Sequence, residues 1–186
     1  MVQLIFFILN NNTFLLYPFE VFKAFIIQFQ QGDIILDILM SLKRVVLGFI
    51  FAAIIAVPLA ILCGYNRHLN SFLKPFVELL RPIPPIAWIP VAILLFGLGD
   101  GSSYFIVFLG AFFPIFTNSY FGATSLPNIY KNVALTFEIN NNTFIRKILF
   151  YFSLPYIFTG LRIGIGMAWM SVIAAELIGA QSGLGY

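Results

Sequence analysis

Glu176 is the carboxylate most open to a chemical role, because it lies inside an otherwise apolar run near the carboxyl end of the sequence. Ionisable groups inside membrane-length segments are costly, and they commonly serve transport or gating. Glu176 stands near the end of its run, where water is close. Its position therefore leaves two interpretations open, a gating or polar contact and simple solvation at the membrane surface.

No catalytic constellation accompanies Glu176. The only histidine, His68, stands in a polar segment, and the only cysteine, Cys63, lies in an apolar run. A metal site needs several ligands at suitable spacing, and nucleophilic catalysis needs a base beside the nucleophile. We therefore expect no enzyme activity, no metal site and no cofactor in this chain.

The elements that position these residues are expected to be membrane helices. The sequence is 61% hydrophobic and 9% charged, with a mean hydropathy of +0.98, which is too apolar for a small soluble fold. A bilayer-spanning helix needs about 20 apolar residues, and the apolar runs do not alternate as barrel strands would. Four runs approach or reach that length: residues 45–64, 82–99, 102–122 and 156–180. The fold class is therefore all-α, a polytopic transmembrane helical bundle.

Before the first run, residues 1–9 form an apolar stub too short to span, and residues 19–29 read as an interfacial helix. Short cytoplasmic loops carry an excess of Lys and Arg. If residues 137–155 lie on the cytoplasmic side, most of the cations lie there too. Lys43 and Arg44 then lie on the outer side, where Asp33 and Asp37 partly offset their charge. Residues 66–81 then become a cytoplasmic connection. The net charge of +3 is scattered, which gives nucleic-acid binding no support.

Small residues recur at every fourth position in two of the runs. This spacing lays them along one stripe of a helix, where another backbone can approach closely. We expect these stripes to pack toward each other or toward a second subunit. The residues are Gly48, Ala52, Ala56, Ala60 and Gly64 in the first run, and Gly160, Gly164 and Ala168 in the last.

Prolines gather at the entry of the second run, in the segment RPIPPIAWIP at residues 81–90. Proline is tolerated at a helix start, but within a helix it removes a hydrogen bond. We expect Pro90 to kink a spanning helix. The segment is either an anchor at the membrane interface or part of a transport path.

Several separated motifs of this sequence resemble the permease subunits of bacterial ABC importers in the nitrate, sulfonate, taurine and bicarbonate class. The motifs are RPIPP at residues 81–85, LPYIFTGLR at 154–162 and AAE at 174–176, within a likeness that covers residues 41–186. The resemblance implies a type I importer permease-like bundle. Relative to that family, the sequence offers less than a full first span and stops before a last one.

The resemblance also gives a role to the polar segment with three consecutive asparagines. Permeases of this class have a cytoplasmic loop, often beginning Glu-Ala-Ala and holding a glycine, whose short coupling helix docks into an ATPase subunit. In this sequence, residues 132–134 stand at the positions of the Glu-Ala-Ala opening, and Glu138 stands at the position of the glycine. Because glutamate is not at ease with positive φ, we expect the asparagines to make the bend and Asn142 to start a helix. The predicted docking residues are Glu138, Ile139, Asn140, Asn141, Asn142, Thr143, Phe144, Ile145 and Arg146.

The sequence therefore predicts a multi-pass permease of an inner (plasma) membrane, in an ATP-driven importer for a small anion or sulfonate-like solute. Expected partners are an ABC ATPase holding ATP and Mg, a second permease copy, a periplasmic binding protein and membrane lipid. Residues 1–40 form an N-terminal segment and residues 41–186 a permease domain, with a coupling loop at 124–155. Glu176 and Pro90 are gate or pathway candidates. The alternatives are a gradient-driven secondary transporter and a nontransporting scaffold. The lack of a recognisable buried charge pair in the sequence counts against the secondary transporter.

Overall fold

The computed structural model describes residues 33–180 and 182–186, and most of these lie in helices, with no β-strand among them. The predicted all-α membrane bundle is confirmed. The stub and the interfacial helix predicted before residue 30 lie outside the described residues. The first described helix, α3 (Asp33–Tyr65), runs without interruption across the boundary proposed at residues 40 and 41.

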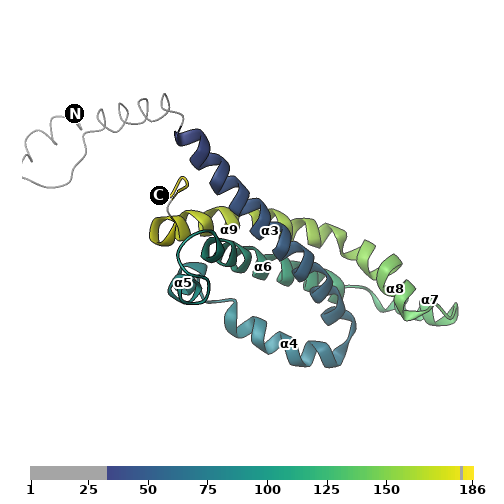
Figure 1. The fold of residues 1–186 in the computed structure, drawn as a ribbon. Helices are drawn as coiled ribbons and strands as arrows, with labels where there is room; N and C mark the ends of the chain where they lie inside the picture. Colours follow the sequence, from purple (N-terminus) through teal and green to yellow (C-terminus); the bar gives the residue numbers. More distant parts are fainter. Residues whose placement is uncertain (1–32, 181) are drawn as a thin grey trace, which may run out of the picture.

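Three long helices form the core of the fold. They are α3, α6 (Asp100–Thr124) and α9 (Phe150–Gly179), and each belongs to a helical segment long and apolar enough to cross a membrane. α6 packs against both of the others (Figure 1). This arrangement makes α6 the central helix of the bundle.

Both stripes of small residues pack against α6. On α3, Ala52, Ala56 and Ala60 are fully buried, and a Cβ added at Gly48 would lie 2.6 Å from Val107 Cγ1. On α9, a Cβ added at Gly164 would lie 2.9 Å from Ile115 Cγ1. Close backbone contact of this kind supplies the packing that lipid does not drive.

The carboxyl-terminal end of the α3 stripe and the start of the α9 stripe make the same close contacts. A Cβ added at Gly64 would lie 2.5 Å from Ala123 Cβ, and one added at Gly160 would lie 3.1 Å from Ile115 Cα. Ala168 is fully buried. The sequence predicts that the two stripes pack on each other or on a second subunit. In this chain both stripes pack on α6, which lies between them.

The span predicted at residues 82–99 is wrong as a complete membrane span, because only residues 85–96 of it are helical. The chain forms α4 (Arg67–Leu80), a 3₁₀ turn η1 (Pro85–Trp88) and a short α5 (Ile89–Phe96), and the two helical parts are bent by 95°. Pro82, Pro84 and Pro85 explain the break, because proline and the residue before it disfavour helix continuation. Only the bent pair taken together is long enough to count as a span.

α4 also differs from the connection predicted for residues 66–81. It is a 14-residue helix whose Leu69, Leu73 and Val77 pack on the core formed by α3, α6 and α9. Asn66 caps it, accepting a hydrogen bond from the backbone N–H of His68 at 2.9 Å.

The expected kink at Pro90 is wrong as well. Pro90 occupies the first turn of α5, where the missing N–H costs no helical hydrogen bond. The direction of the chain changes before this residue, in the proline-rich turn.

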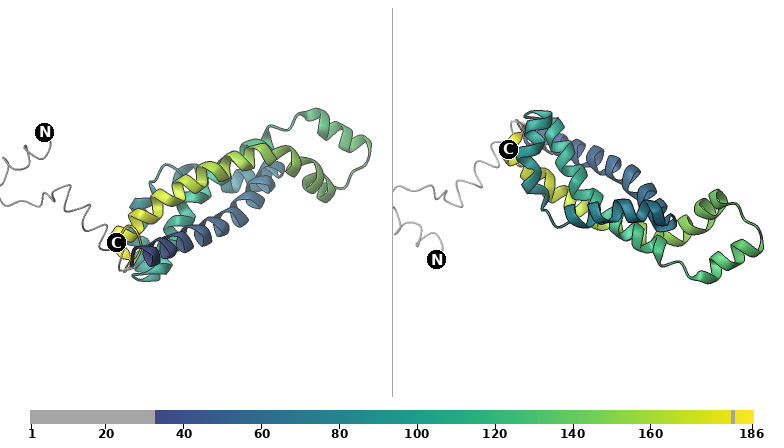
Figure 2. Two further views of the ribbon diagram at one scale, coloured as in Figure 1. Left: turned by 90° about the horizontal axis from the view of Figure 1, so that it is seen from above. Right: turned by 90° about the horizontal axis from the view of Figure 1, so that it is seen from below.

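Beyond α6 the chain continues into α7 (Asn128–Thr136), α8 (Asn141–Phe144) and a π-helical turn η2 (Ile145–Leu149) that leads into α9. These elements project past one end of the bundle, away from the carboxyl terminus (Figure 2). The segment Asn141–Gly179 is helical throughout. A force applied to the projecting end is therefore passed directly into α9.

Candidate functional site

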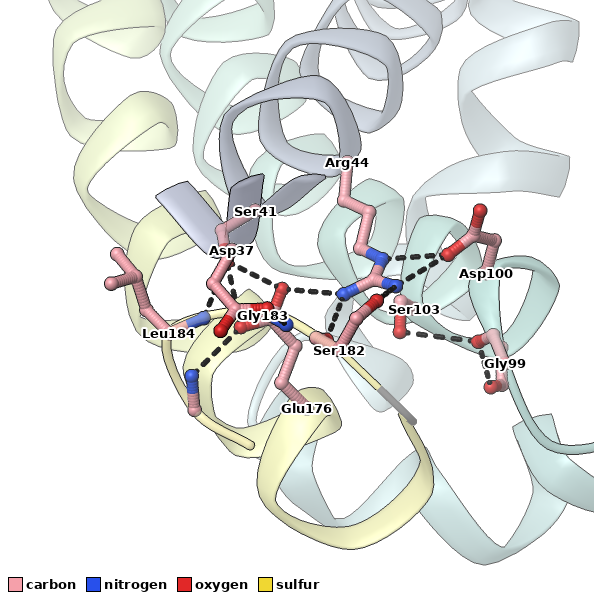
Figure 3. Close-up of polar contacts among 12 residues, drawn as sticks. Asp37, Ser41, Arg44, Gly99, Asp100, Ser103, Glu176, Ser182, Gly183 and Leu184 are labelled. Atoms are coloured by element: carbon pink, nitrogen blue, oxygen red, sulfur yellow. Dashed lines mark hydrogen bonds and ion pairs between the residues drawn. The ribbon is translucent and has the colours of Figure 1, made fainter. Parts of the chain in front are cut away.

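A buried ion pair joins α3 to α9 at the end of the bundle that holds the carboxyl terminus. Arg44 Nη1 lies 2.9 Å from Glu176 Oε1, and the two side chains are 3% and 0% exposed. Ser41 Oγ lies 2.8 and 2.9 Å from the two Glu176 oxygens and shares its single proton between them. Figure 3 shows Arg44 reaching between Glu176 and Asp100.

All three guanidinium nitrogens of Arg44 have partners. Nε donates to Asp100 Oδ1 at 2.8 Å, and Nη2 lies 2.6 Å from the same oxygen. Nη1 also donates to the carbonyl oxygen of Ser182 at 2.6 Å, and Nη2 donates to Ser182 Oγ at 3.0 Å. Such complete pairing offsets the large cost of taking a guanidinium out of water.

The carboxyl-terminal residues close over this pair through backbone N–H groups. Gly183 N donates to Asp37 Oδ1 at 2.7 Å, Leu184 N to Ser41 Oγ at 2.9 Å, and Gly185 N to Glu176 Oε2 at 3.0 Å (Figure 3). Gly183 has φ +115°, and a Cβ there would lie 2.5 Å from the Glu176 carboxyl carbon. Only glycine meets both conditions. We call the residues Asp37, Ser41, Arg44, Asp100, Glu176 and Ser182 to Gly185 the outer cluster.

The outer cluster decides between the two interpretations of Glu176 and corrects the expectation that the chain has no buried charge pair. Glu176 is not solvated at the membrane surface but buried in a polar contact, and the chain does contain a buried charge pair. Arg44, Asp100, Ser41 and Asp37 were missed as site residues. A signal was present, because residues 37, 41 and 44 share one face of α3 and continue the stripe of small residues that begins at Gly48.

At the opposite end, the turn between α7 and α8 corrects the prediction that asparagines make the bend. Glu138 itself has φ +50°. Ile139 N donates to Ala134 O at 2.9 Å and Glu138 N to Leu135 O at 3.1 Å, which is the Schellman pattern of a helix end. That pattern needs a left-handed residue directly after the cap, so the α7 ending fixes the conformation of Glu138.

The asparagines serve α8 instead. Asn140 is the helix cap, with φ −60°, and its side chain accepts a hydrogen bond from Asn142 N at 3.2 Å. α8 begins at Asn141, so the predicted start at Asn142 is wrong by one residue. An N-cap needs extended backbone, which explains why Asn140 is not used for the bend.

The predicted docking residues differ in exposure. Glu138, Asn140, Asn141, Asn142, Thr143 and Arg146 are exposed, Ile139 and Ile145 are half-buried, and Phe144 is buried. Phe144 lies against Tyr65 at the end of α3, with ring centroids 5.9 Å apart. A groove of about 210 Å³ runs between Tyr65, Lys131, Leu135 and Asn141. Movement of this turn is thereby linked to α3 as well as to α9.

A glycine at position 138 is expected to stabilise the turn by about 1 kcal/mol, because a left-handed non-glycine residue stores roughly that strain. Hydrogen exchange at the Ile139 amide, which reports opening of the α7 ending, should slow in Glu138→Gly. The control Asn140→Gly replaces a residue at φ −60° and should not slow it. Equal exchange in Glu138→Gly and the unmodified chain would show that Glu138 is unstrained.

Residues 56–186 match the family described as binding-protein-dependent transport system inner membrane component. The chain belongs to this family. The match spans the α6 core, the α7 and α8 turn and the carboxyl-terminal half of the outer cluster. The resemblance inferred from the separated motifs is confirmed, as are the multi-pass membrane location and the assignment to a class of transport components rather than enzymes.

Individual permeases show the same relationship. A putative ABC transporter permease of Methanocaldococcus jannaschii is 43% identical over 183 residues, covering 96% of this chain and 68% of that protein. The nitrate import permease of Synechococcus elongatus is 36% identical over 151 residues, covering 81% and 54%. The bicarbonate transport system permease of Synechococcus elongatus is 42% identical over 138 residues, covering 74% and 50%. This permease chain thus spans about two thirds of the first relative and about half of the other two.

Proposed function

We propose that the chain is the transmembrane permease component of an ATP-driven importer for a small anion or sulfonate-like solute. The observation that carries the proposal is the projecting α7–α8 turn, which is continuous with α9 and contacts α3. It belongs to a chain of the permease family. Nitrate and bicarbonate are the solutes in the names of two relatives. These names favour a small anion as the solute here.

In this proposal an ABC ATPase subunit, which holds ATP and Mg, grips the turn on the cytoplasmic side. The predicted docking set would present exposed polar groups and the cation Arg146, next to the exposed Lys147. Closure of two ATPase subunits pulls on the turns of two permease copies. The pull reaches α9 through the continuous helix and α3 through the Phe144–Tyr65 contact.

A periplasmic binding protein would deliver solute at the other end, where the outer cluster closes α3, α6 and α9 together. A buried, fully paired charge network is stable when assembled and costly when half-broken, so it suits an element with two discrete states. Glu176 would act there as a gate residue through Arg44. Nucleotide favours one state of the permease only by binding that state better.

A gradient-driven transporter remains the alternative. The Arg44–Glu176 pair removes one argument against it, but the pair lies at the end of the bundle, whereas ion-coupling sites of secondary transporters lie near the membrane midplane. Uptake by the purified chain from a sodium or pH gradient without any ATPase would favour this alternative.

Reversing the charge of Arg146 and Lys147 tests the proposal. The double change to glutamate should reduce the ATPase recovered with the tagged chain from its source cells by about tenfold, equivalent to about 1.4 kcal/mol of binding. Recovery is measured as ATP hydrolysis in the eluate. Both side chains are exposed, whereas Ile145 packs partly into the core, so this variant perturbs folding less than Ile145→Asp.

The matched control reverses two exposed cations of α4, Arg67 and Lys74. It should leave ATPase recovery near that of the unmodified chain. Undiminished recovery from the Arg146 and Lys147 variant would count against docking at the turn.

A further inference from the structure

A cavity opens beside the break between α4 and α5. Its volume is about 270 Å³, just below the roughly 300–1,000 Å³ typical of sites for drug-sized ligands. Arg81, Pro85, Gly110, Thr117, Asn118 and Met167 are among its lining residues. The space therefore suits a small solute rather than a large metabolite.

Arg81 is the only charged group among the described residues that line this cavity. Thr117 and Asn118 add polar atoms. Asn118 uses one of its two Nδ2 hydrogens in a bond to Pro114 O at 2.8 Å, and Thr117 Oγ1 donates to Phe113 O at 2.8 Å. A guanidinium beside a free amide N–H, with no carboxylate among the described lining residues, selects for negative charge.

The cavity lies at the middle of the bundle. Its α6 residues, from Leu109 to Asn118, occupy the central part of a helix that runs from Asp100 to Thr124. Charged side chains at that depth of a membrane protein almost always face the protein interior or a water-filled space. Arg81 is exposed on the surface of this chain, so its surroundings in the membrane must be aqueous or another protein surface.

Arg162 supplies a second cation at the same depth. It lies between Gly160 and Gly164, both of which meet Ile115 near the middle of α6, and it is exposed on α9. Its neighbour Ile163 lines the cavity. Two guanidinium groups at mid-depth make the local potential positive.

The backbone around the cavity is also suited to hold water. Pro114 has no N–H to donate to the carbonyl group of Gly110, and both residues line the cavity. Breaks in membrane helices are tolerated where the backbone is buried in protein or lines a wet space. The bent α4–α5 pair and Pro114 place two such irregularities at one site.

We propose that this cavity is a binding station on the permeation path, where Arg81 recognises a small oxyanion. The proposal rests on the importer function and adds to it the residue that selects the charge of the solute. The remaining Nδ2 hydrogen of Asn118 would donate to the anion beside Arg81. Arg162 would raise the anion concentration near the station without being part of it.

The test places a cysteine in the cavity of the full chain in membranes. Cys63 is the only natural cysteine and is buried, so Thr117→Cys in a Cys63→Ala background gives a single reactive thiol. Two methanethiosulfonate reagents are compared, one with a sulfonate group and one with a trimethylammonium group. The sulfonate reagent should react faster after normalisation to a thiol in solution. Arg81→Gln should lower this preference about tenfold, and Arg81→Lys should retain most of it.

Lys74→Gln is the control, because Lys74 lies on α4, does not line the cavity and is 3.6 Å from Glu78. It should leave the preference unchanged. Asn118→Cys serves as a second reporter should Thr117→Cys fold poorly. A lack of reaction with both reagents in folded protein, or an equal preference with and without the Arg81→Gln change, would overturn the proposal.

Recovery of the ATPase is measured on the same cysteine protein. Normal recovery without a charge preference would reject the anion station and leave the importer function standing. A retained preference without ATPase recovery would reject the importer function instead.

Discussion

Replacing Arg44 with methionine is expected to destabilise the folded chain by about 3–5 kcal/mol, because the Glu176 carboxylate would stay buried without its counter-ion. Ser41 and the Gly185 N–H would be its remaining donors. Thermal unfolding of the purified chain in detergent measures the loss. This single change removes the partner that joins α3 to both α6 and α9.

The double variant Arg44→Met with Glu176→Leu should recover much of the lost stability, since it removes both buried charges. Asp100 is 45% exposed and can be solvated in either variant. Lys43→Met, at the exposed neighbouring position, is the control and should change little. If Arg44→Met unfolds at the same temperature as Lys43→Met, the ion pair does not hold the outer cluster together.

Gly164→Leu is expected to destabilise the packing of α9 on α6, with a cost of about 1–3 kcal/mol. A Cβ at this position would already lie 2.9 Å from Ile115 Cγ1 and 3.3 Å from Ala111 O, so α9 would have to move away from α6. The unfolding temperature in detergent is the readout.

Gly166→Leu on the same helix is the matched control. A Cβ at Gly166 meets nothing within 4 Å, and both variants gain the same helix propensity. Gly166→Leu should therefore be neutral or slightly stabilising in the isolated chain. Equal unfolding temperatures for the two variants would show that α9 does not depend on close contact at Gly164.

The features that could be predicted from the sequence are those with a local or periodic signal. Apolar runs located the three long helices, and the fourfold spacing identified the faces of α3 and α9 that pack closely. The bent α4–α5 pair was missed because hydropathy alone assigned residues 66–81 to a connection and residues 82–99 to a span of their own. The outer cluster was missed because Arg44 and Glu176 are 132 residues apart, and only the folded bundle brings them together.

The turn between α7 and α8 shows a different limit. Intrinsic preference pointed to asparagine for the left-handed residue, yet Glu138 occupies that conformation. The hydrogen-bond pattern at the end of α7 determines which position must be left-handed, and residue preference then only changes the energy of the turn. Helix ends of this kind are better predicted from where the preceding helix stops than from residue type.

The long separation within the outer cluster has a consequence for biogenesis. α3 leaves the ribosome before α6 and α9, and Asp100 follows Arg44 after 56 residues, whereas Glu176 follows after 132. At about 5–20 residues per second, the last counter-ion emerges on the order of ten seconds after Arg44. Asp100 is thus the earlier-synthesised counter-ion of Arg44, and the cluster can be completed only when translation has nearly reached Tyr186.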